Sequence, residues 1–155
     1  MKKILVIACL VFLTYPALTF ASDWRFTGQS KSGNEYYIDV DAMSYDHSDG
    51  NQKNRVIVHE RTILTGQQIQ HYQDFARKRG TYYSAWDNLT YIITHYMFDL
   101  SNKTYAMTYL VFLDSNNNTI AEFKQNNFIF RPVPPDSFDE KTFNLITQNI
   151  NKVKD

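Results

Sequence analysis

Histidines are the residue type in this chain best suited to metal binding or proton transfer, and the sequence contains four of them. No two lie at the short intervals that bring metal ligands together, and the pattern His-Glu-x-x-His is absent. Isolated histidines in strands and loops are usually polar or half-buried residues without a ligand. The sequence therefore predicts no metal site at His47, His59, His71 or His95.

The acidic residues cluster only where local structure explains them. Asp39 and Asp41 lie at the end of a predicted strand. Asp136, Asp139 and Glu140 surround the predicted start of a helix, where the helix dipole stabilises negative charge. Neither group predicts a pair of carboxylates for general acid–base catalysis.

One segment partly resembles a calcium-binding loop. Asp114-Ser-Asn-Asn-Asn118 matches the first half of such a loop, but Thr119 and Gln125 stand where it requires glycine and glutamate. An asparagine-rich turn between strands explains the segment better. The chain also has no G-x-S-x-G motif and, with 5 glycines, no glycine-rich phosphate loop. We therefore predict no catalytic residues, no cofactor and no enzymatic activity.

The start of the chain has the three parts of a secretory signal peptide. Lys2 and Lys3 form the basic part, and residues 4–13 form an unbroken apolar run. Small residues then stand at positions −3 and −1 relative to a cleavage point after Ala21. We expect residues 1–21 to be removed.

Two other interpretations of this segment fit less well. An uncleaved anchor is disfavoured because Pro16 interrupts the apolar run before the roughly 20 residues that a membrane-spanning helix needs. Lipidation at Cys9 would leave too short an apolar core for export. We expect residues 22–155 to form one exported domain, located in the periplasm, at the cell surface or outside the cell, with no stable membrane anchor.

The expected mature chain carries 14 basic and 16 acidic residues, since two of the 16 Lys and Arg residues lie in the signal peptide. A net charge of −2 argues against nucleic acid or an anionic membrane as a partner, because both need a concentrated basic surface. Cys9 is the only cysteine, so we expect no disulfide after cleavage. The domain must then be stabilised by packing alone.

Apolar residues make up 43% of the chain, which is enough for one packed core. Apolar and aromatic runs separated by turn residues predict about six strands, and their short connections predict an antiparallel sheet. These strands cover residues 23–28, 35–39, 55–64, 89–99, 104–114 and 119–126. Ile69, Tyr72, Phe75 and Ala76 have helical spacing and predict a short helix over residues 66–80, with an extended segment as the alternative.

A second helix is expected at the C-terminus. Ser137 and Glu140 have the spacing of a capping box, in which the serine caps the helix and the glutamate bonds back to the serine amide. An apolar stripe at helical spacing follows, formed by Phe143, Ile146, Ile150 and Val153. The predicted fold is therefore α+β, a single antiparallel sheet with this amphipathic helix packed on one face.

The two strongest strands have no polar side, unlike strands of a sheet with one face in water. Simple alternation places Tyr105, Met107, Tyr109 and Val111 on one face. One C-terminal helix cannot cover both faces. The second face is therefore wrapped by residues 44–83 or offered to another chain, unless its tyrosines are simply half-exposed. The candidate binding residues are the aromatic side chains Tyr91, Tyr105 and Tyr109.

Motifs in both halves of the expected mature chain are similar to those of a known family. They are Trp24, Glu35-Tyr-Tyr-Ile-Asp39, Arg55-Val-Ile-Val58, Tyr96-Met-Phe-Asp99, Lys103-Thr-Tyr105, the strand to Leu113-Asp114, and Pro134-Pro-Asp-Ser137. They resemble the surface-adhesin E-like domains of bacteria over roughly residues 23–150, and they are structural motifs, none of them catalytic.

This resemblance implies a small secreted domain with an antiparallel sheet and a C-terminal helix across one face. Some members of that family bind host extracellular-matrix proteins. Such domains commonly carry a cysteine pair that ties the helix to the sheet, and the expected mature chain has none.

Three functions from different classes follow. The leading hypothesis is an exported, non-enzymatic binding domain with a protein partner, adhesin-like if that partner is host matrix. The second is a periplasmic or envelope structural protein that forms a homodimer through an aromatic sheet face. The third is an enzyme of unrecognised mechanism, which a pocket gathering Asp, Glu and His from distant strands would favour.

Overall fold

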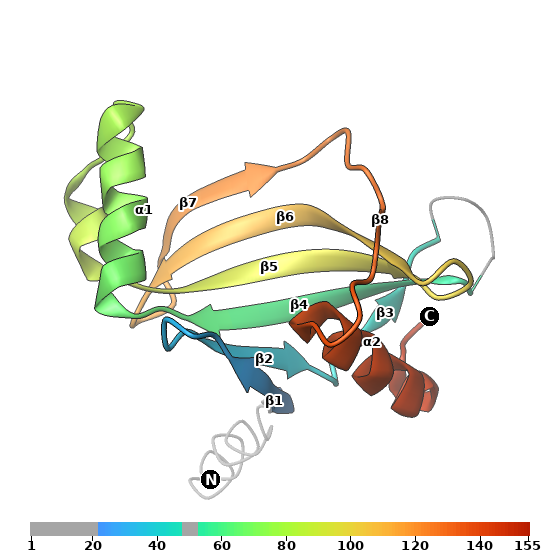
Figure 1. Cartoon of the computed structure of the whole chain (residues 1–155). Coiled ribbons are helices and arrows are strands. Elements are labelled where there is room, and N and C mark those ends of the chain that lie inside the picture. The colour runs from blue at the N-terminus through green and yellow to red at the C-terminus, as the bar shows by residue number, and fades with distance from the viewer. Residues whose placement is uncertain (1–21, 48–52) are drawn as a thin grey trace, which may run out of the picture.

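A mostly antiparallel sheet runs through the computed structural model, which describes residues 22–47 and 53–155 (Figure 1). The predicted signal peptide lies outside the described residues. Six strands follow one another across the sheet in the order β1-β2-β4-β5-β6-β7. They are β1 Trp24–Gln29, β2 Glu35–Asp39, β4 Arg55–Ile63, β5 Leu89–Asp99, β6 Thr104–Asp114 and β7 Thr119–Lys124. Each neighbouring pair is antiparallel, as the short connections predict.

Two short strands bring the sheet to eight, more than the six predicted. β3 Ser44–Tyr45 pairs with β4, and β8 Arg131–Pro132 pairs with the start of β6. The helices are α1 Gly66–Lys78, η1 Ser84–Asn88, α2 Phe138–Gln148 and η2 Ile150–Lys152. The α+β class and the C-terminal helix are therefore confirmed.

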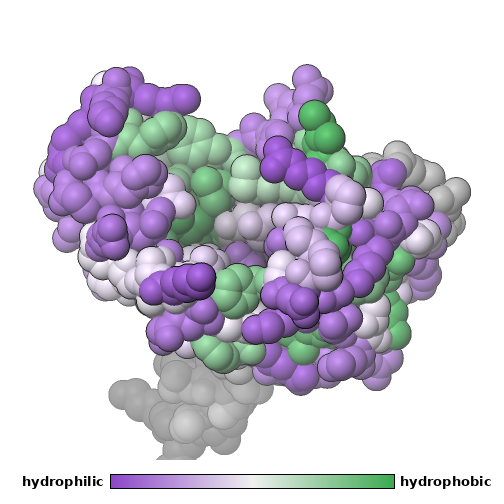
Figure 2. Space-filling view, in the orientation of Figure 1, coloured by the Kyte–Doolittle hydropathy of each residue, from purple (hydrophilic) through white to green (hydrophobic). Residues whose placement is uncertain are grey.

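Both α-helices pack on the same face of the sheet, near its opposite ends. The ring of Tyr72 in α1 lies 5.1 Å from that of Phe112, and the ring of Phe143 in α2 lies 6.4 Å from that of Phe98. Phe112 is paired with Ile92, and Ile92 shares a side of β5 with Phe98 because the two lie six positions apart, an even number. We call this side the helix face. Its centre is left uncovered between the helices, and Figure 2 shows the molecule hollowed there.

The opposite side of the sheet, which we call the open face, has no helix packed on it in the described residues. Of the alternatives for this face, wrapping by residues 44–83 is not seen in the described part of that segment, because α1 turns onto the helix face instead. There Ala76 of α1 joins Leu64 and Trp86 in a buried apolar cluster with strand residues. The apolar side of α1 thus covers one end of the helix face, which α2 at the other end does not reach.

A β-bulge in β6 separates residues that simple alternation puts together. Tyr96 pairs with Met107 while its neighbour His95 pairs with Tyr109, so Thr108 is the extra residue. Paired residues in an antiparallel ladder share a face. Tyr105 and Met107 therefore lie on the helix face, whereas Tyr109, Val111 and Leu113 lie on the open face. The prediction that Tyr105, Met107, Tyr109 and Val111 share one face is wrong for this reason.

The C-terminal helix begins as predicted and ends earlier than predicted. The Glu140 amide donates to the Ser137 hydroxyl at 3.0 Å, which confirms the cap. The Glu140 carboxylate accepts from the amide of Asp136, 2.8 Å away, and not from that of Ser137. The helix stops at Gln148, and Ile150 is 38% exposed, so the predicted apolar stripe does not extend through it.

Gly28 allows α2 to approach the edge of the sheet closely. The ring of Phe138 lies over it, and a β-carbon at position 28 would be 2.2 Å from a ring carbon. The same ring stacks on Tyr36, with 4.7 Å between centroids. This contact fixes the first turn of α2 against β1 and β2.

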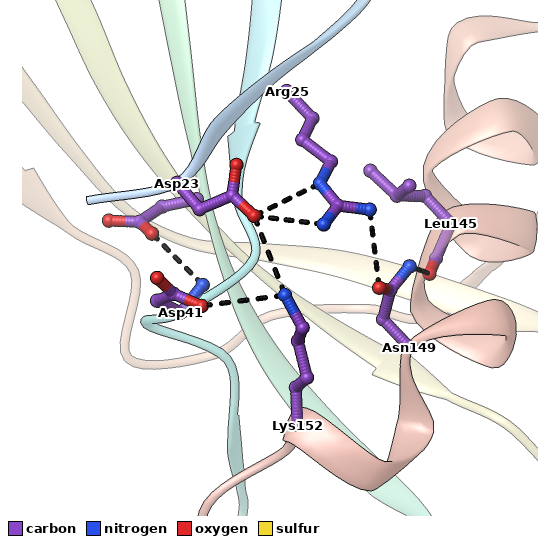
Figure 3. A network of polar contacts seen from close by, with 7 residues as sticks. Asp23, Arg25, Asp41, Leu145, Asn149 and Lys152 are labelled. Atoms are coloured by element: carbon purple, nitrogen blue, oxygen red, sulfur yellow. Dashed lines mark hydrogen bonds and ion pairs between the residues drawn. The ribbon is translucent and has the colours of Figure 1, made fainter. Parts of the chain in front are cut away.

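Polar contacts tie the end of the chain to β1 without a disulfide (Figure 3). Arg25 forms an ion pair with Asp23 at 2.9 Å and donates to the Asn149 side chain at 3.3 Å. Lys152 lies 3.5 Å from Asp23 and 3.8 Å from Asp41. These side chains are partly exposed, and such pairs each contribute little stability. The helix is therefore stabilised mainly by its buried side chains.

Candidate functional site

A pocket of about 350 Å³ opens in the uncovered centre of the helix face, beside the first turn of α2 (Figure 2). Side chains from three strands and the helix line it. We call it the Glu60 pocket and define it by Tyr36, Glu60, Tyr96, Phe138 and Asp139, with Asp136, Ser137 and Lys141 at its other walls. Its lining combines aromatic rings with a few polar groups, which is the usual composition of a ligand site.

Glu60 forms part of the strand wall and is 6% exposed. Glu60 follows Val56 and Val58 on the side of β4 that belongs to the helix face, so its side chain lies at the floor of the pocket. Burial, and after it the charge of Asp139, raise the pKa of its carboxyl from 4.5 to about 7, although a hydrogen bond with Thr62 acts to lower it. A group with this pKa changes charge near neutral pH.

Asp139 reaches the pocket from the first turn of α2. Burial raises the pKa of its carboxyl, and a hydrogen bond from the Tyr105 hydroxyl opposes that rise. Burial and this contact in turn raise the pKa of Tyr105 to about 12. Tyr105 therefore stays a neutral hydrogen-bond donor, and it holds Asp139 in place.

Tyr96 joins the Glu60 pocket to a second one of about 260 Å³ under β8. Burial, and then the charge of Glu60, raise the pKa of Tyr96 far above its ordinary value. Tyr105, Met107 and Arg131 contribute to the second pocket. Tyr96 is the one lining residue that the two pockets share.

The predicted binding residues do not form one site. Tyr105 lies on the helix face near Asp139. Tyr91 and Tyr109 lie on the open face, where Ile93 stands between Tyr91 and His95, the residue that pairs with Tyr109. The bulge at Thr108 causes this split. The structure instead assembles its pocket around Glu60 and Asp139, neither of which the sequence interpretation selected as a binding residue.

A sequence signal for Glu60 does exist. Alternation along residues 55–63 places Glu60 on the same side as Val56 and Val58. Burying a carboxylate on such an apolar side costs free energy unless the group is paired or protonated. Asp139 carries no such signal, because an acidic residue in the first turn of a helix is common for electrostatic reasons alone.

Two histidines that look isolated in the sequence are neighbours on the open face. The rings of His59 and His95 stack with 4.1 Å between centroids, and Tyr109 meets His95 edge-on at 5.1 Å. Burial lowers the pKa of His59, and burial together with the charge of His59 lowers the pKa of His95 to about 4. This stack is therefore uncharged at neutral pH.

Within residues 22–47 and 53–155, no three His, Cys, Asp or Glu side chains are grouped so that they could hold a metal ion. The histidine pair lies on the opposite side of the sheet from Glu60 and Asp139. The Glu60 pocket thus gathers Asp and Glu from distant elements but no histidine.

No helix in the described part of the chain has the length and apolar character needed to cross a membrane. No protein-family model matches the chain. A comparison with curated proteins likewise finds no match.

Proposed function

We propose that this chain is an exported, non-enzymatic binding domain whose ligand occupies the Glu60 pocket. The observation that carries the proposal is that two helices cover only the ends of one sheet face. A buried carboxyl and three aromatic rings therefore meet at a solvent-accessible pocket. Because α1 and α2 pack on the sheet at the two ends of the hollow, the sheet between them is a rigid frame for such a site.

A protein of the host extracellular matrix is the partner we propose, and the resemblance to surface-adhesin E-like domains supports it. The test uses residues 22–155 and immobilised matrix proteins. Tyr36→Ala removes a pocket wall, and Tyr37→Ala is its matched control, because this adjacent tyrosine lies on the open face beside Phe26. Both variants lose a half-buried ring, and because Tyr36→Ala also loses the stack on Phe138, the unfolding midpoint of each variant is measured beside its binding.

Binding that is lost in Tyr36→Ala and kept in Tyr37→Ala would support the pocket as the binding site. Equal loss in both variants would contradict it. A parent chain that binds no matrix protein would refute adhesion. Export is tested separately by the intact mass of the protein from its native cells, which should correspond to a chain beginning at Ser22.

A second candidate function, self-association through the open face, is favoured by the absence of a helix on that side in the described residues. Phe26 is 58% exposed there, and the stacked histidines and Tyr109 continue the aromatic surface. A stable interface of this kind would bury well over roughly 1,000 Å².

The β6 bulge supplies a sharp test of this candidate. Tyr109→Glu places a charge on the open face beside Glu122, whereas Met107→Glu places it on the helix face only two residues away. Sedimentation velocity should show a dimer that Tyr109→Glu weakens and Met107→Glu does not. A parent chain that stays monomeric at all practical concentrations would refute self-association.

A further inference from the structure

Three carboxyl groups line the Glu60 pocket, and two of them, Glu60 and Asp139, are partly or fully buried and lack a basic partner among the described residues. Among the described residues, no Lys or Arg side chain forms an ion pair with Glu60 or Asp139. The two groups are close enough that the charge of Asp139 disfavours ionisation of Glu60. A buried carboxylate is stable only with a counter-charge or a proton. No ion pair with a described residue therefore balances the charge of Glu60 when it is ionised.

The walls of the pocket add a second preference for positive charge. The face of an aromatic ring attracts cations, and Tyr36, Tyr96 and Phe138 bring three rings to the pocket. One of them already has a cation over it, since the Lys141 ammonium lies 5.2 Å from the centre of the Phe138 ring. Lys141 is exposed and belongs to the pocket's outer wall.

We propose that the Glu60 pocket binds an organic cation, an ammonium or guanidinium group placed between the two carboxylates and the aromatic rings. This inference rests on the proposed function, because it names the ligand class of the same site. The cationic group belongs either to a basic side chain of a protein partner or to a free amine, and the two sources share this chemistry.

Binding of such a group depends on pH through the two carboxyls. The other titratable groups that face them are Tyr36, Tyr96, Asp136 and Lys141, with Tyr105 bonded to Asp139. Because the pKa of Glu60 is about 7, its carboxylate is mostly protonated at pH 5 and mostly ionised at pH 8. The affinity for a cation should therefore rise over this interval.

The test is an NMR titration of residues 22–155 with n-butylammonium, with neutral n-butanol and with butyrate, at pH 5 and pH 8. We expect n-butylammonium to shift the amide signals of pocket residues at pH 8 and to bind more weakly at pH 5. Glu60→Gln keeps the shape of the side chain and should raise the Kd about tenfold or more. Glu122→Gln, an exposed carboxylate on β7 outside the pocket, is the matched control and should change little.

Two further arms separate the sources of the cation. A blocked Gly-Lys-Gly peptide that binds more tightly than n-butylammonium indicates a protein side chain, and the reverse order indicates a free amine. Butanol or butyrate shifting the pocket signals as strongly as n-butylammonium would overturn the cation inference while leaving the proposed pocket intact. An n-butylammonium Kd that is unchanged in Glu60→Gln would overturn it as well.

Discussion

Replacing Ile146 by aspartate tests whether the C-terminal helix is needed for the fold. The Ile146 side chain is 0% exposed and lies in the apolar cluster of Ile38, Val58 and Phe98. Losing its buried atoms costs about 2–5 kcal/mol by comparison with Ile→Ala changes in other cores. An unpaired carboxylate in apolar surroundings adds several kcal/mol, unless it takes up a proton at a further cost.

The total for Ile146→Asp is therefore at least about 4 kcal/mol, against roughly 5–15 kcal/mol for the stability of a whole domain. Denaturant unfolding followed by circular dichroism measures it, and we expect the variant to be largely unfolded or to unfold at much lower denaturant. Ile146→Ala provides a measurable intermediate at about 2–5 kcal/mol.

The matched control is Asn144→Asp, which introduces the same charge on the exposed side of the helix. A surface change of this kind is usually worth less than about 0.5 kcal/mol. Equal unfolding midpoints for the Asn144 and Ile146 aspartate variants would mean that the helix is not docked, and the argument from burial would be refuted.

Three further predictions concern the same framework. Ser137→Ala removes the N-cap bond to the Glu140 amide and should cost about 1 kcal/mol in denaturant unfolding; no measurable cost would mean that the bond does not form in solution. Gly28→Ala pushes a methyl group into the Phe138 ring and should lower the free energy of unfolding by roughly 1–3 kcal/mol. Gly66→Ala, at an unobstructed helix start, should raise it by up to about 1 kcal/mol. Equal effects of the two changes would contradict the close contact at Gly28. Glu60 has a raised pKa in the folded state, so the folded chain binds more protons and loses stability as pH rises from about 4.5 to about 7. Glu60→Gln should remove up to roughly 3 kcal/mol of that decline, and an unchanged pH profile would show that Glu60 is not buried in solution.

Local patterns were sufficient for most of the secondary structure. The bounds of β2, β5 and β6 agree with the predicted ranges at every residue, because apolar runs and turn residues mark both ends of each strand. The start of α2 was also readable, since a helix cap is a contact between residues three apart. Short connections between strands then implied the antiparallel order.

The assignment of residues to the two faces of the sheet could not be read from alternation alone. One extra residue at Thr108 moves Tyr105 and Met107 to the side opposite Tyr109. A count of alternate residues along β6 does not reveal the inserted residue. The bulge is seen only in the pairing of β6 with β5. The predicted aromatic site was divided for this reason.

The sequence by itself determined six of the eight strands, the start of the C-terminal helix and the α+β class, because these depend on residues near one another along the chain. Only the tertiary structure decided that α1 and α2 pack at opposite ends of the same face. It alone brought Glu60 and Asp139 together across 79 positions of sequence. Contacts of this kind depend on how helices fit onto a twisted sheet, and the alternation that singles out Glu60 carries no information about Asp139. A pocket made from such contacts therefore leaves no pattern at either residue that identifies its partner.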